Sequence, residues 1–468
     1  MENELWRLTA SELASAITKG EVGAVEAVRA YLARIESVNP RVNAVTNVLK
    51  ETALEAAREV DRKRAAGYEL GPLAGVPFTV KENIDVVGSA TTHGVPVLRQ
   101  AMPSADAPIV ERLRQAEAIP IGRTNLPDFS MRFHTSSQLY GDTINPWDPK
   151  LSPGGSSGGE GVALATGMSA LGLGNDAGGS VRIPALFSGV AALKPSYGRF
   201  PGDRTVGPRD LTLASQWIPV DGVLARSVTD LQSAFQILSG PDARDPRTVP
   251  APLIGAPSNR RVGVVPDPGG QSIHANARRA VESAAALLEE AGYSIEIVDV
   301  PRLEESLEAY RKLIMTEFSL VWPTLQRLLS PDGRRYIELG MQQQAPVDLA
   351  EYIRLTAVRQ GIQRDWAQML DQYSLLLGPT FTEQPVEPGF DARGSEEHAL
   401  VARAMRLCTA SSFVGVPAVA VPTAVVDGLP QGVQIIGGFY REDLCLEAAA
   451  VIEAGCGRLT PIDPRRIP

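Results

Sequence analysis

Apolar residues recur at helical spacing through the first 66 residues of the chain. The stretches VEAVRAYLARIESV (25–38) and ETALEAAREVDRKRAAG (51–67) both repeat apolar residues every three or four positions, and the second ends at a glycine. Thr9 and Ser11 are candidate helix N-caps, because a hydroxyl there can accept a backbone N–H. We therefore predict an N-terminal helical segment over residues 1–66.

The pattern changes at Gly71, where short apolar runs alternate with Gly, Pro, Ser and Asn. The runs GVPFTV (75–80) and IPIG (119–122) are typical of buried strands joined by loops. Further on, RRVGVV (260–265), ANARRAVESAAALLEEAG (275–292) and YSIEIVDV (293–300) give strand, helix with a glycine stop, and strand. This alternation predicts an α/β protein.

The last third of the chain returns to the same two patterns. Residues 301–373 are predicted mostly helical, and 348–370 is long enough for a lid or packing helix. Strands are expected in LLLGPT (375–380), AVAVP (418–422) and GVQIIG (432–437), followed by a helix over 442–454. No internal repeat or low-complexity linker is visible.

Length and composition narrow the class of protein. At 468 residues the chain exceeds the roughly 250–300 at which one core stops growing, so we expect two or three domains or one large one. Apolar residues at 44% and charged residues at 21% are those of an ordinary globular protein. The net charge of −9 is the wrong sign for a nucleic-acid partner.

Cysteine usage and the N-terminus predict the compartment. Cys408, Cys445 and Cys456 form no C-x-x-C pair, which suggests neither a disulfide framework nor a metal site. The N-terminus lacks a basic start followed by an apolar stretch, and no run reaches the ~18–20 apolar residues of a membrane span. We expect a cytoplasmic protein with no membrane partner, no metal and no cofactor.

The segment from Ser152 to Ala185 carries the strongest chemical signal. Glycine is used where backbone takes a positive φ or approaches a ligand, so GGSSGG (154–159) and AGGS (177–180) suggest two backbone cradles, each presenting a serine. The alternative is that these glycines only form turns. From glycine content alone, both interpretations stay open.

Two familiar motifs match this segment but lack their structural context. Residues 154–158 fit G-x-S-x-G, which would make Ser156 a nucleophile with His274 or His398 as its base, but three prolines in NPWDPKLSP argue against the strand that must precede it. Residues 172–177 fit G-x-G-x-x-A. Pro184 is expected to interrupt any following helix, and no acidic residue follows before residue 202, so no dinucleotide site is predicted.

Because histidine is scarce in this chain, lysine is the other candidate for the general base. The chain has only four histidines, and a lysine can accept a proton if desolvation lowers its pKa. Lys81 follows directly on the apolar run 75–80, and Lys194 in GVAALKPS has a similar setting. Spacing does not choose between the two lysines.

The order of four segments resembles the amidase signature family. These are GVPFTVKENIDV (75–86), NPWDPKLSPGGSSGGEG (145–161), GLGNDAGGSVRIPA (172–185) and AALKPSYGR (191–199). LLLGPT and residues 414–437 also resemble it, so the likeness runs from about residue 71 to the C-terminus and is loose only over 255–370.

The resemblance implies a fold and a domain organisation. The fold would be the α/β amidase signature fold, a large mixed twisted β-sheet covered on both faces by helices. Residues 67–468 would form the catalytic domain, with the helical segment 1–66 packing on it. Residues 255–370 would be a more variable, partly helical insertion that shapes the substrate pocket.

The resemblance also implies the site residues. It assigns a catalytic lysine to Lys81, a bridging serine, preceded by a cis peptide, to Ser156, and the nucleophile to Ser180. An oxyanion hole would come from the backbone N–H groups of Ala177, Gly178, Gly179 and Ser180. Asp176, Arg182 and Ser157 would be supporting residues.

An aromatic-rich loop precedes the two serines. In similar proteins the loop FSMRFHTSSQLYG (129–141) lines the acyl pocket, so Met131, Phe133 and His134 are the expected pocket walls. The alternative is that these side chains only pack, since apolar groups line cores and pockets alike. His134 is expected to be a hydrogen-bonding wall and not a base.

The likeness leaves rival functions open. The first is an amidase on a small aryl or hydrophobic acyl amide, anilide, carbamate or urea, acting through an acyl-enzyme. Glu160 resembles the fatty-acid amide hydrolase branch, and FPGDRTVGPRD (200–210) resembles indoleacetamide hydrolases. The second is the glutaminase subunit of a tRNA-dependent amidotransferase, which needs partner subunits. A catalytically inactive binding protein is disfavoured because all three triad residues are present. Members often dimerise, which leaves a homodimer open.

Overall fold

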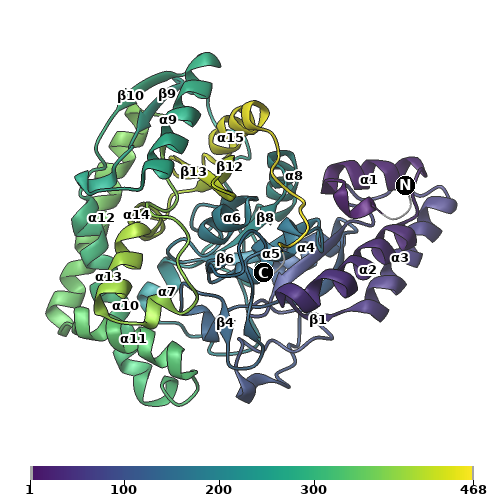
Figure 1. Ribbon diagram of the computed structural model, residues 1–468, viewed down its shortest axis with the longest axis horizontal. Helices are drawn as coiled ribbons and strands as arrows, with labels where there is room; N and C mark the ends of the chain where they lie inside the picture. The colour runs from purple at the N-terminus through teal and green to yellow at the C-terminus, as the bar shows by residue number, and fades with distance from the viewer. Residues whose placement is uncertain (1–3, 466–468) are drawn as a thin grey trace.

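A mixed sheet of 11 strands runs through the protein in the computed structural model, which describes residues 4–465 (Figure 1). Its strand order is β1-β3-β2-β6-β8-β7-β12-β13-β11-β9-β10. The strands are β1 (Val45–Val48), β2 (Pro77–Lys81), β3 (Ile119–Thr124), β6 (Leu171–Asp176), β7 (Ala191–Lys194), β8 (Val220–Ala225), β9 (Arg261–Val264), β10 (Ser294–Ile297), β11 (Leu375–Pro379), β12 (Ala418–Val426) and β13 (Leu429–Gly437). A separate hairpin pairs β4 (Ser136–Ser137) with β5 (Gly141–Asp142).

Helices connect these strands and cover the sheet. They are α1 (Ala10–Lys19), α2 (Ala24–Val42), α3 (Lys50–Ala65), α4 (Pro108–Gln115), α5 (Gly158–Ala165), α6 (Arg182–Ser188), α7 (Leu213–Trp217), α8 (Val228–Leu238), α9 (Ala275–Glu290), α10 (Leu303–Leu325), α11 (Pro331–Gln343), α12 (Leu349–Gln372), α13 (Ser395–Ala404), α14 (Arg406–Val414) and α15 (Glu442–Cys456). Short 3-10 turns are Leu5–Arg7, Pro96–Leu98, Asp128–Ser130, Pro268–Gly270 and Phe390–Ala392.

The sheet is buried on both faces. Along β11, Leu375 and Leu377 pack with α8, α9 and α15 in one apolar cluster, whereas Leu376 packs with α10, α12 and α14 in another. Alternate residues of a strand point to opposite faces, so this split places helices on both sides of the sheet. The predicted α/β fold with a mixed sheet between helical layers is confirmed.

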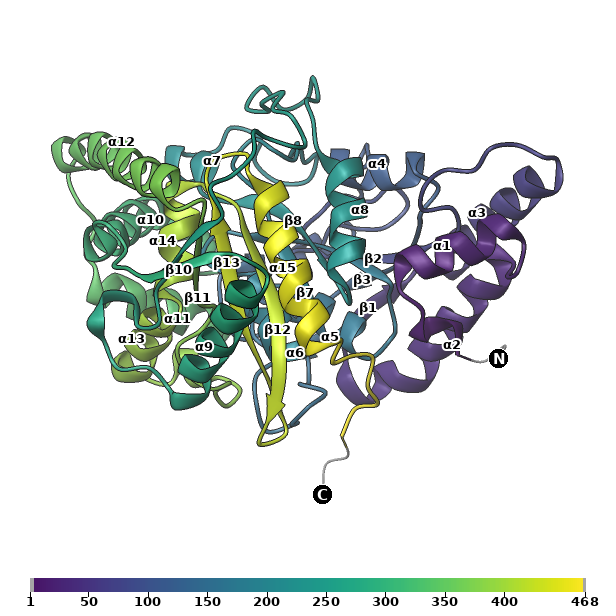
Figure 2. The same ribbon diagram turned by 90° about the horizontal axis from the view of Figure 1, so that it is seen from above.

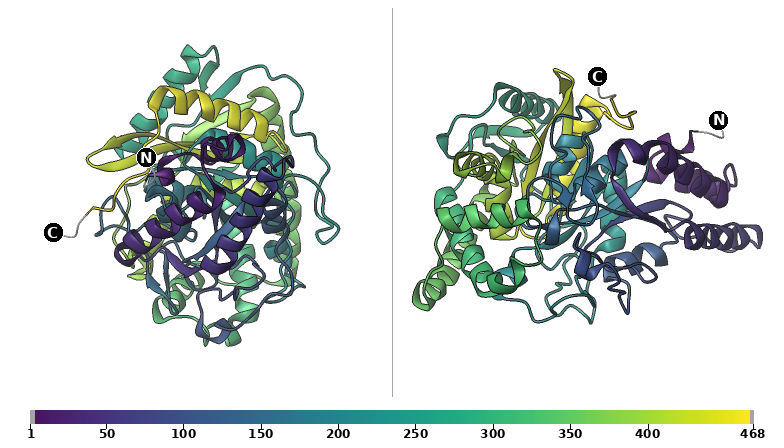
Figure 3. Two further views of the ribbon diagram at one scale, coloured as in Figure 1. Left: turned by 90° about the vertical axis from the view of Figure 1, so that its right-hand side faces the viewer. Right: turned by 60° about the horizontal axis from the view of Figure 1, so that its bottom comes forward.

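The N-terminal helices and the helices α10–α13 lie at opposite ends of the sheet (Figure 2). The right-hand view of Figure 3 shows the same separation. Thr9 caps α1 as predicted, with its hydroxyl accepting the N–H of Glu12. The N-terminal segment also supplies β1, which pairs antiparallel with β3 at the sheet edge and was not expected from the pattern.

The predicted strand–helix–strand unit at 260–300 forms as expected. β9 and β10 pair in parallel, α9 connects them, and Gly292 after the helix has a φ of 87°. One expectation was wrong: Pro184 does not prevent a helix after β6. It lies in the first turn of α6, where a missing N–H leaves no helical hydrogen bond unmade.

The two strands that carry the candidate site are neighbours in the sheet. β2 pairs in parallel with both β3 and β6, and every residue of β2, β3 and β6 is buried. The carboxyl ends of parallel strands meet at one edge, so Lys81 at the end of β2 lies beside the end of β6. Within residues 4–465, no helix is long and apolar enough to cross a membrane.

Candidate active site

Lys81 lies at the end of β2 with its side chain fully buried. Its Nζ is 2.7 Å from Ser156 Oγ and 2.8 Å from Asn175 Oδ1. Burial, and after it the charge of Arg204, lowers the pKa of Lys81 well below its usual value. This setting favours the neutral amine, the form that can accept a proton from a hydroxyl.

The other candidate bases lie elsewhere. Lys194 on β7 is also buried, but its Nζ donates to the carbonyls of Pro195 and Val416 at 3.0 and 2.7 Å. His274 caps α9 through Nδ1, and His398 Nδ1 is 3.3 Å from the Asp391 carbonyl. The structure therefore pairs only Lys81 with Ser156, and no strand precedes the G-x-S-x-G match within residues 143–157.

Ser156 lies in a bend of the chain just before α5 begins at Gly158. The Gly155–Ser156 peptide is cis, as the family resemblance implied. A Cβ on Gly155 would lie 2.3 Å from the carbonyl oxygen of Phe133, so only glycine fits against this neighbouring backbone. The N–H of Ser157 donates to the carbonyl of Ser180 at 3.1 Å, which brings the two predicted serine cradles side by side.

Ser180 lies in a loop after β6, which we call the 177–181 loop. The Asp176 carboxylate accepts the N–H groups of Gly179 at 2.7 Å and Val181 at 3.2 Å. Among the described residues, the N–H groups of Ala177, Gly178 and Ser180 have no acceptor. Three of the four expected oxyanion donors are thus unpaired, while the fourth, Gly179, is occupied by Asp176.

Arg182 is linked to this loop through Asp176. Its guanidinium binds the Asp176 carboxylate at 2.9 and 3.1 Å, and neither side chain is exposed. Burial alone would raise the pKa of Asp176, but the charge and hydrogen bonds of Arg182, the charge of Lys194 and the Gly179 N–H together outweigh burial and hold that pKa below its usual value. The remaining Arg182 N–H groups donate to acceptors on α14 and β13, namely Cys408, Ser411, Ser412 and Gln434.

The three expected pocket walls have different surroundings. Phe133 is 3% exposed and packs with Phe187 and Phe381, at ring-centroid distances of 5.8 and 5.2 Å. Met131 is partly exposed and joins an aromatic cluster from the 129–131 loop, α10 and α11: Phe129, Phe318, Trp322, Tyr336 and Met341. Of the three, only Met131 keeps an accessible side chain.

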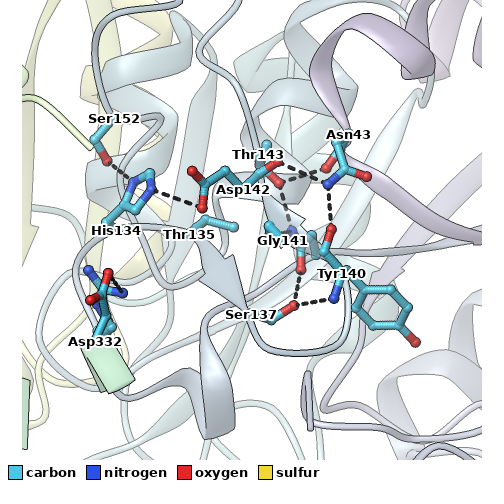
Figure 4. A network of polar contacts seen from close by, with 12 residues as sticks. Asn43, His134, Thr135, Ser137, Tyr140, Gly141, Asp142, Thr143, Ser152 and Asp332 are labelled. Carbon is cyan, nitrogen blue, oxygen red and sulfur yellow. Dashed lines mark hydrogen bonds and ion pairs between the residues drawn. The ribbon is translucent and has the colours of Figure 1, made fainter. Parts of the chain in front are cut away.

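His134 is held in a polar network with Ser152 and Asp142 (Figure 4). Its Nδ1 is 2.9 Å from Ser152 Oγ, its Nε2 is 3.8 Å from Asp142 Oδ1, and its backbone N–H donates to Asp391. The ring is buried and hydrogen-bonded, and its role as a pocket wall stays a prediction.

Several groups beside the site were not singled out from the sequence. Asn175 on β6 accepts from Lys81, and Asn83 after β2 accepts from Asn175. Arg204 pairs with Asp221 at 2.8 Å near Lys81. The Tyr310 hydroxyl of α10 would be 3.3 Å from a Cβ on Gly178. Their positions depend on strand pairing and helix packing, which motif reading does not supply.

Glu160 is a buried carboxyl on α5. It accepts hydroxyl hydrogen bonds from Thr79 and Thr124, both at 2.6 Å. Burial raises the pKa of Glu160 to about 7, against the opposing effect of these two hydroxyls. Among residues 4–465, no group of three or more His, Cys, Asp or Glu side chains is arranged to hold a metal ion.

Comparison with known proteins agrees with this geometry. The sequence model of the amidase family matches residues 26–446. Indoleacetamide hydrolase of Bradyrhizobium diazoefficiens is 38% identical over 459 residues, covering 97% of this chain and 88% of that protein. A glutamyl-tRNA(Gln) amidotransferase subunit of Salinispora tropica is 32% identical over 497 residues, covering 98% of this chain and 99% of that one.

A solved structure gives the same picture for the fold. The 6-aminohexanoate cyclic dimer hydrolase with bound substrate superposes with a TM-score of 0.82 at 27% identity, over 99% of both chains. The chain therefore belongs to the amidase signature family. It is a hydrolase that acts on carbon–nitrogen bonds in amides.

Proposed function

We propose that the enzyme cleaves amides with a triad of Lys81, Ser156 and Ser180. The observation that carries this proposal is the 2.7 Å contact between Lys81 Nζ and Ser156 Oγ in a fully buried setting. Neutral Lys81 takes the hydroxyl proton of Ser156, and Ser156 takes that of Ser180. The Ser180 oxygen bonds to the amide carbon, whose π electrons move to the carbonyl oxygen.

The resulting oxyanion is stabilised by the 177–181 loop. The free N–H groups of Ala177, Gly178 and Ser180 are suited to receive it, and the loss of one such donor typically costs about 2.7–4 kcal/mol of transition-state stabilisation. Asp176 and Arg182 act as supports that keep the N–H groups aimed. The occupied N–H of Gly179 is left out of the proposed set.

Proton return completes the reaction. The proton on Lys81 passes back through Ser156 to the leaving nitrogen as the carbon–nitrogen bond breaks, leaving an acyl ester on Ser180. Water then loses a proton to the same relay and bonds to the acyl carbon. The ester bond to Ser180 breaks, the acid departs and the three residues regain their first protonation states.

We propose a small amide with an aryl or other hydrophobic acyl group as substrate. The accessible Met131 packs with aromatic residues of α10 and α11, which offer apolar surface. The same helix α10 carries Tyr310, whose hydroxyl approaches Gly178 of the 177–181 loop. Residues 255–370, which contain α10 and α11, would then shape the pocket on a catalytic domain of residues 67–468. The indoleacetamide hydrolase relative supports an arylacetic amide.

The second candidate is a glutaminase subunit of a tRNA-dependent amidotransferase. The glutamyl-tRNA(Gln) amidotransferase relatives match over nearly the whole of both chains, which favours keeping this candidate. The relative named indoleacetamide hydrolase has the higher identity, so we place the independent amidase first. We also propose that the enzyme works in the cytoplasm, because its three cysteines are free. It would act there alone or as a homodimer.

The test is turnover of a substrate panel followed by mass spectrometry. The panel contains arylacetamides, alkyl amides, anilides, carbamates, ureas, esters and glutamine, with Ser180→Ala, Lys81→Ala and Ser156→Ala beside the wild type. Arylacetamide hydrolysis that is lost in all three variants supports the triad and the substrate class. Lys194→Met is the matched control. Among the described residues, the amine of this second buried lysine donates to two backbone carbonyls and not to Ser156, so its loss should leave the relay intact.

Each part of the proposal can fail on its own. Turnover confined to glutamine would replace the independent amidase by the glutaminase. Activity that survives in Ser180→Ala would remove the assigned nucleophile. Size-exclusion chromatography with light scattering measures the molar mass and so distinguishes a monomer from a homodimer.

A further inference from the structure

Among residues 4–465, the amine of Lys81 has two hydrogen-bond partners, and only one of them belongs to the proposed triad. Nζ donates to Asn175 Oδ1 at 2.8 Å, and Ser156 Oγ lies 2.7 Å from the same nitrogen. Asn175 is one residue from the end of β6, the strand that pairs in parallel with β2. It is 7% exposed, so water offers little competition for this contact.

The amide of Asn175 cannot turn its oxygen away from Lys81 without losing a second contact. Its Nδ2 donates to Asn83 Oδ1 at 2.8 Å, and the Nδ2 of Asn83 donates to Ser130 Oγ at 2.9 Å. Each amide therefore fixes the direction of the next. Since Ser130 adjoins Met131, this chain also ties the lysine to the loop proposed to line the pocket.

An amide oxygen orders a lysine differently from a carboxylate. Both accept a hydrogen bond from Nζ, but a carboxylate adds an opposite charge that stabilises the ammonium form. The charged groups facing Lys81 come from four elements: Asp176 of β6, Asp221 of β8, Glu160 of α5 and Arg204 of the 200–210 loop. Arg204 forms an ion pair with Asp221, so the negative charge of that carboxylate is balanced by the guanidinium.

We propose that Asn175, which is itself held by Asn83, is a positioning residue for Lys81. Asn175 directs the lone pair of the neutral amine at Ser156. Its uncharged amide adds no negative charge that would keep the amine protonated. With one N–H bonded to Asn175 Oδ1, rotation of the amine is restricted. The lone pair of the neutral amine then faces the Ser156 hydroxyl, and the N–H bond formed when the proton is taken points at the same oxygen for its return. This role rests on the proposed function of Lys81 as the base.

The test is the pH dependence of kcat/KM on one amide substrate for Asn175→Asp and Asn175→Ala. The aspartate keeps the size and the acceptor but adds a charge next to Nζ, so the acid limb should move up by about one pH unit or more, with activity regained at alkaline pH. The alanine removes the acceptor, so kcat should fall about tenfold or more at every pH, with no upward movement of the limb.

Asn83→Ala gives a second measurement that does not depend on the folding of a charged variant. It frees the Asn175 amide to turn, so kcat should fall several-fold while KM and the acid limb stay near the wild type. Circular dichroism and the melting temperature of all variants are compared with the wild type, because a purely structural role would lower stability without moving the limb.

Failure of this inference differs from failure of the triad. An Asn175→Asp limb that coincides with the wild-type limb, or an unchanged kcat in both Asn175→Ala and Asn83→Ala, overturns the positioning role. In that case Lys81→Ala would still be inactive. If Lys81→Ala itself keeps full activity, the proposed function fails first, and the positioning role fails with it.

Discussion

Arg182 and Asp176 form a fully buried ion pair beneath the 177–181 loop, with Arg182 Nη2 2.9 Å from Asp176 Oδ1. The same carboxylate accepts the N–H of Gly179, so one side chain joins the guanidinium to the loop that carries Ser180. A buried ion pair contributes less by itself than the removal of one partner costs. The pair is thus best tested by single substitution.

Asp176→Asn leaves the buried Arg182 without its anionic partner. The free energy of unfolding should fall by about 3–5 kcal/mol, and kcat should fall because the loop loses an acceptor that fixes it. Urea unfolding and steady-state kinetics measure the two effects. Asp203→Asn is the control: its partner Arg209 is 66% exposed, so its loss should cost no more than about 1 kcal/mol. Equal losses in the two variants would contradict a supporting role for Asp176.

Two adjacent glycines should respond differently to alanine. Gly179 has a φ of +127°, and a Cβ there would lie 2.7 Å from Ile183 Cδ1, so Gly179→Ala must shift the 177–181 loop. We expect kcat to fall by about 10²–10³-fold, the effect of losing an oxyanion donor. Gly178→Ala meets nothing closer than Tyr310 Oη at 3.3 Å and should mainly raise KM. A smaller kcat loss in Gly179→Ala than in Gly178→Ala would refute this view of the loop.

Arg204 should set part of the pH dependence. Its positive charge favours the neutral form of Lys81, so Arg204→Ala should raise the pKa of Lys81 and move the acid limb of kcat/KM to higher pH. Activity at pH 6 should fall several-fold while activity at high pH is retained, and the difference should shrink in high salt. Arg209→Ala, on the same loop and paired to Asp203, should leave the limb unmoved.

Glu160 links stability to pH in the opposite direction from an ion-paired carboxylate. The pKa of Glu160 is raised from 4.5 to about 7 in the folded protein. Its contribution to the free energy of unfolding is therefore fully present below pH 4.5, the pKa in the unfolded chain, and is lost as the pH rises through 7. Relative to Glu160→Gln, wild type should lose about 2–3 kcal/mol of unfolding free energy between pH 5 and 8. Denaturant unfolding of both proteins across this range measures it. A constant difference would mean that Glu160 does not titrate there.

The sequence predicted those elements whose pattern is decided locally. The strand–helix–strand unit at 260–300 and the buried strand ending in Lys81 have clear periods and boundaries. β1 was missed because Val45–Val48 is short and half polar, and it becomes a strand only by pairing with β3. Pro184 was misread because its cost depends on its place in the first turn of α6, which the pattern does not define.

The same division holds for the site. Glycine content drew attention to Ser156 and Ser180, but the choice of Lys81 over Lys194 needed either the family resemblance or the contact with Ser156. Asn175 lies inside the segment with the strongest signal, yet its side chain gains meaning only when β6 lies beside β2. When the role of a residue depends on a partner far along the chain, the neighbouring sequence does not predict that role.

The distant partners of Arg182 have a consequence for how the protein is made. Ser411, Ser412 and Gln434 follow Arg182 in the sequence by 229, 230 and 252 residues. A nascent chain that has already emerged through Ser180 therefore holds all three residues of the proposed triad without the distant groups that bind Arg182. We therefore expect activity to appear only after ribosomal synthesis has passed β13. Contacts between residues so far apart in the sequence form slowly during folding.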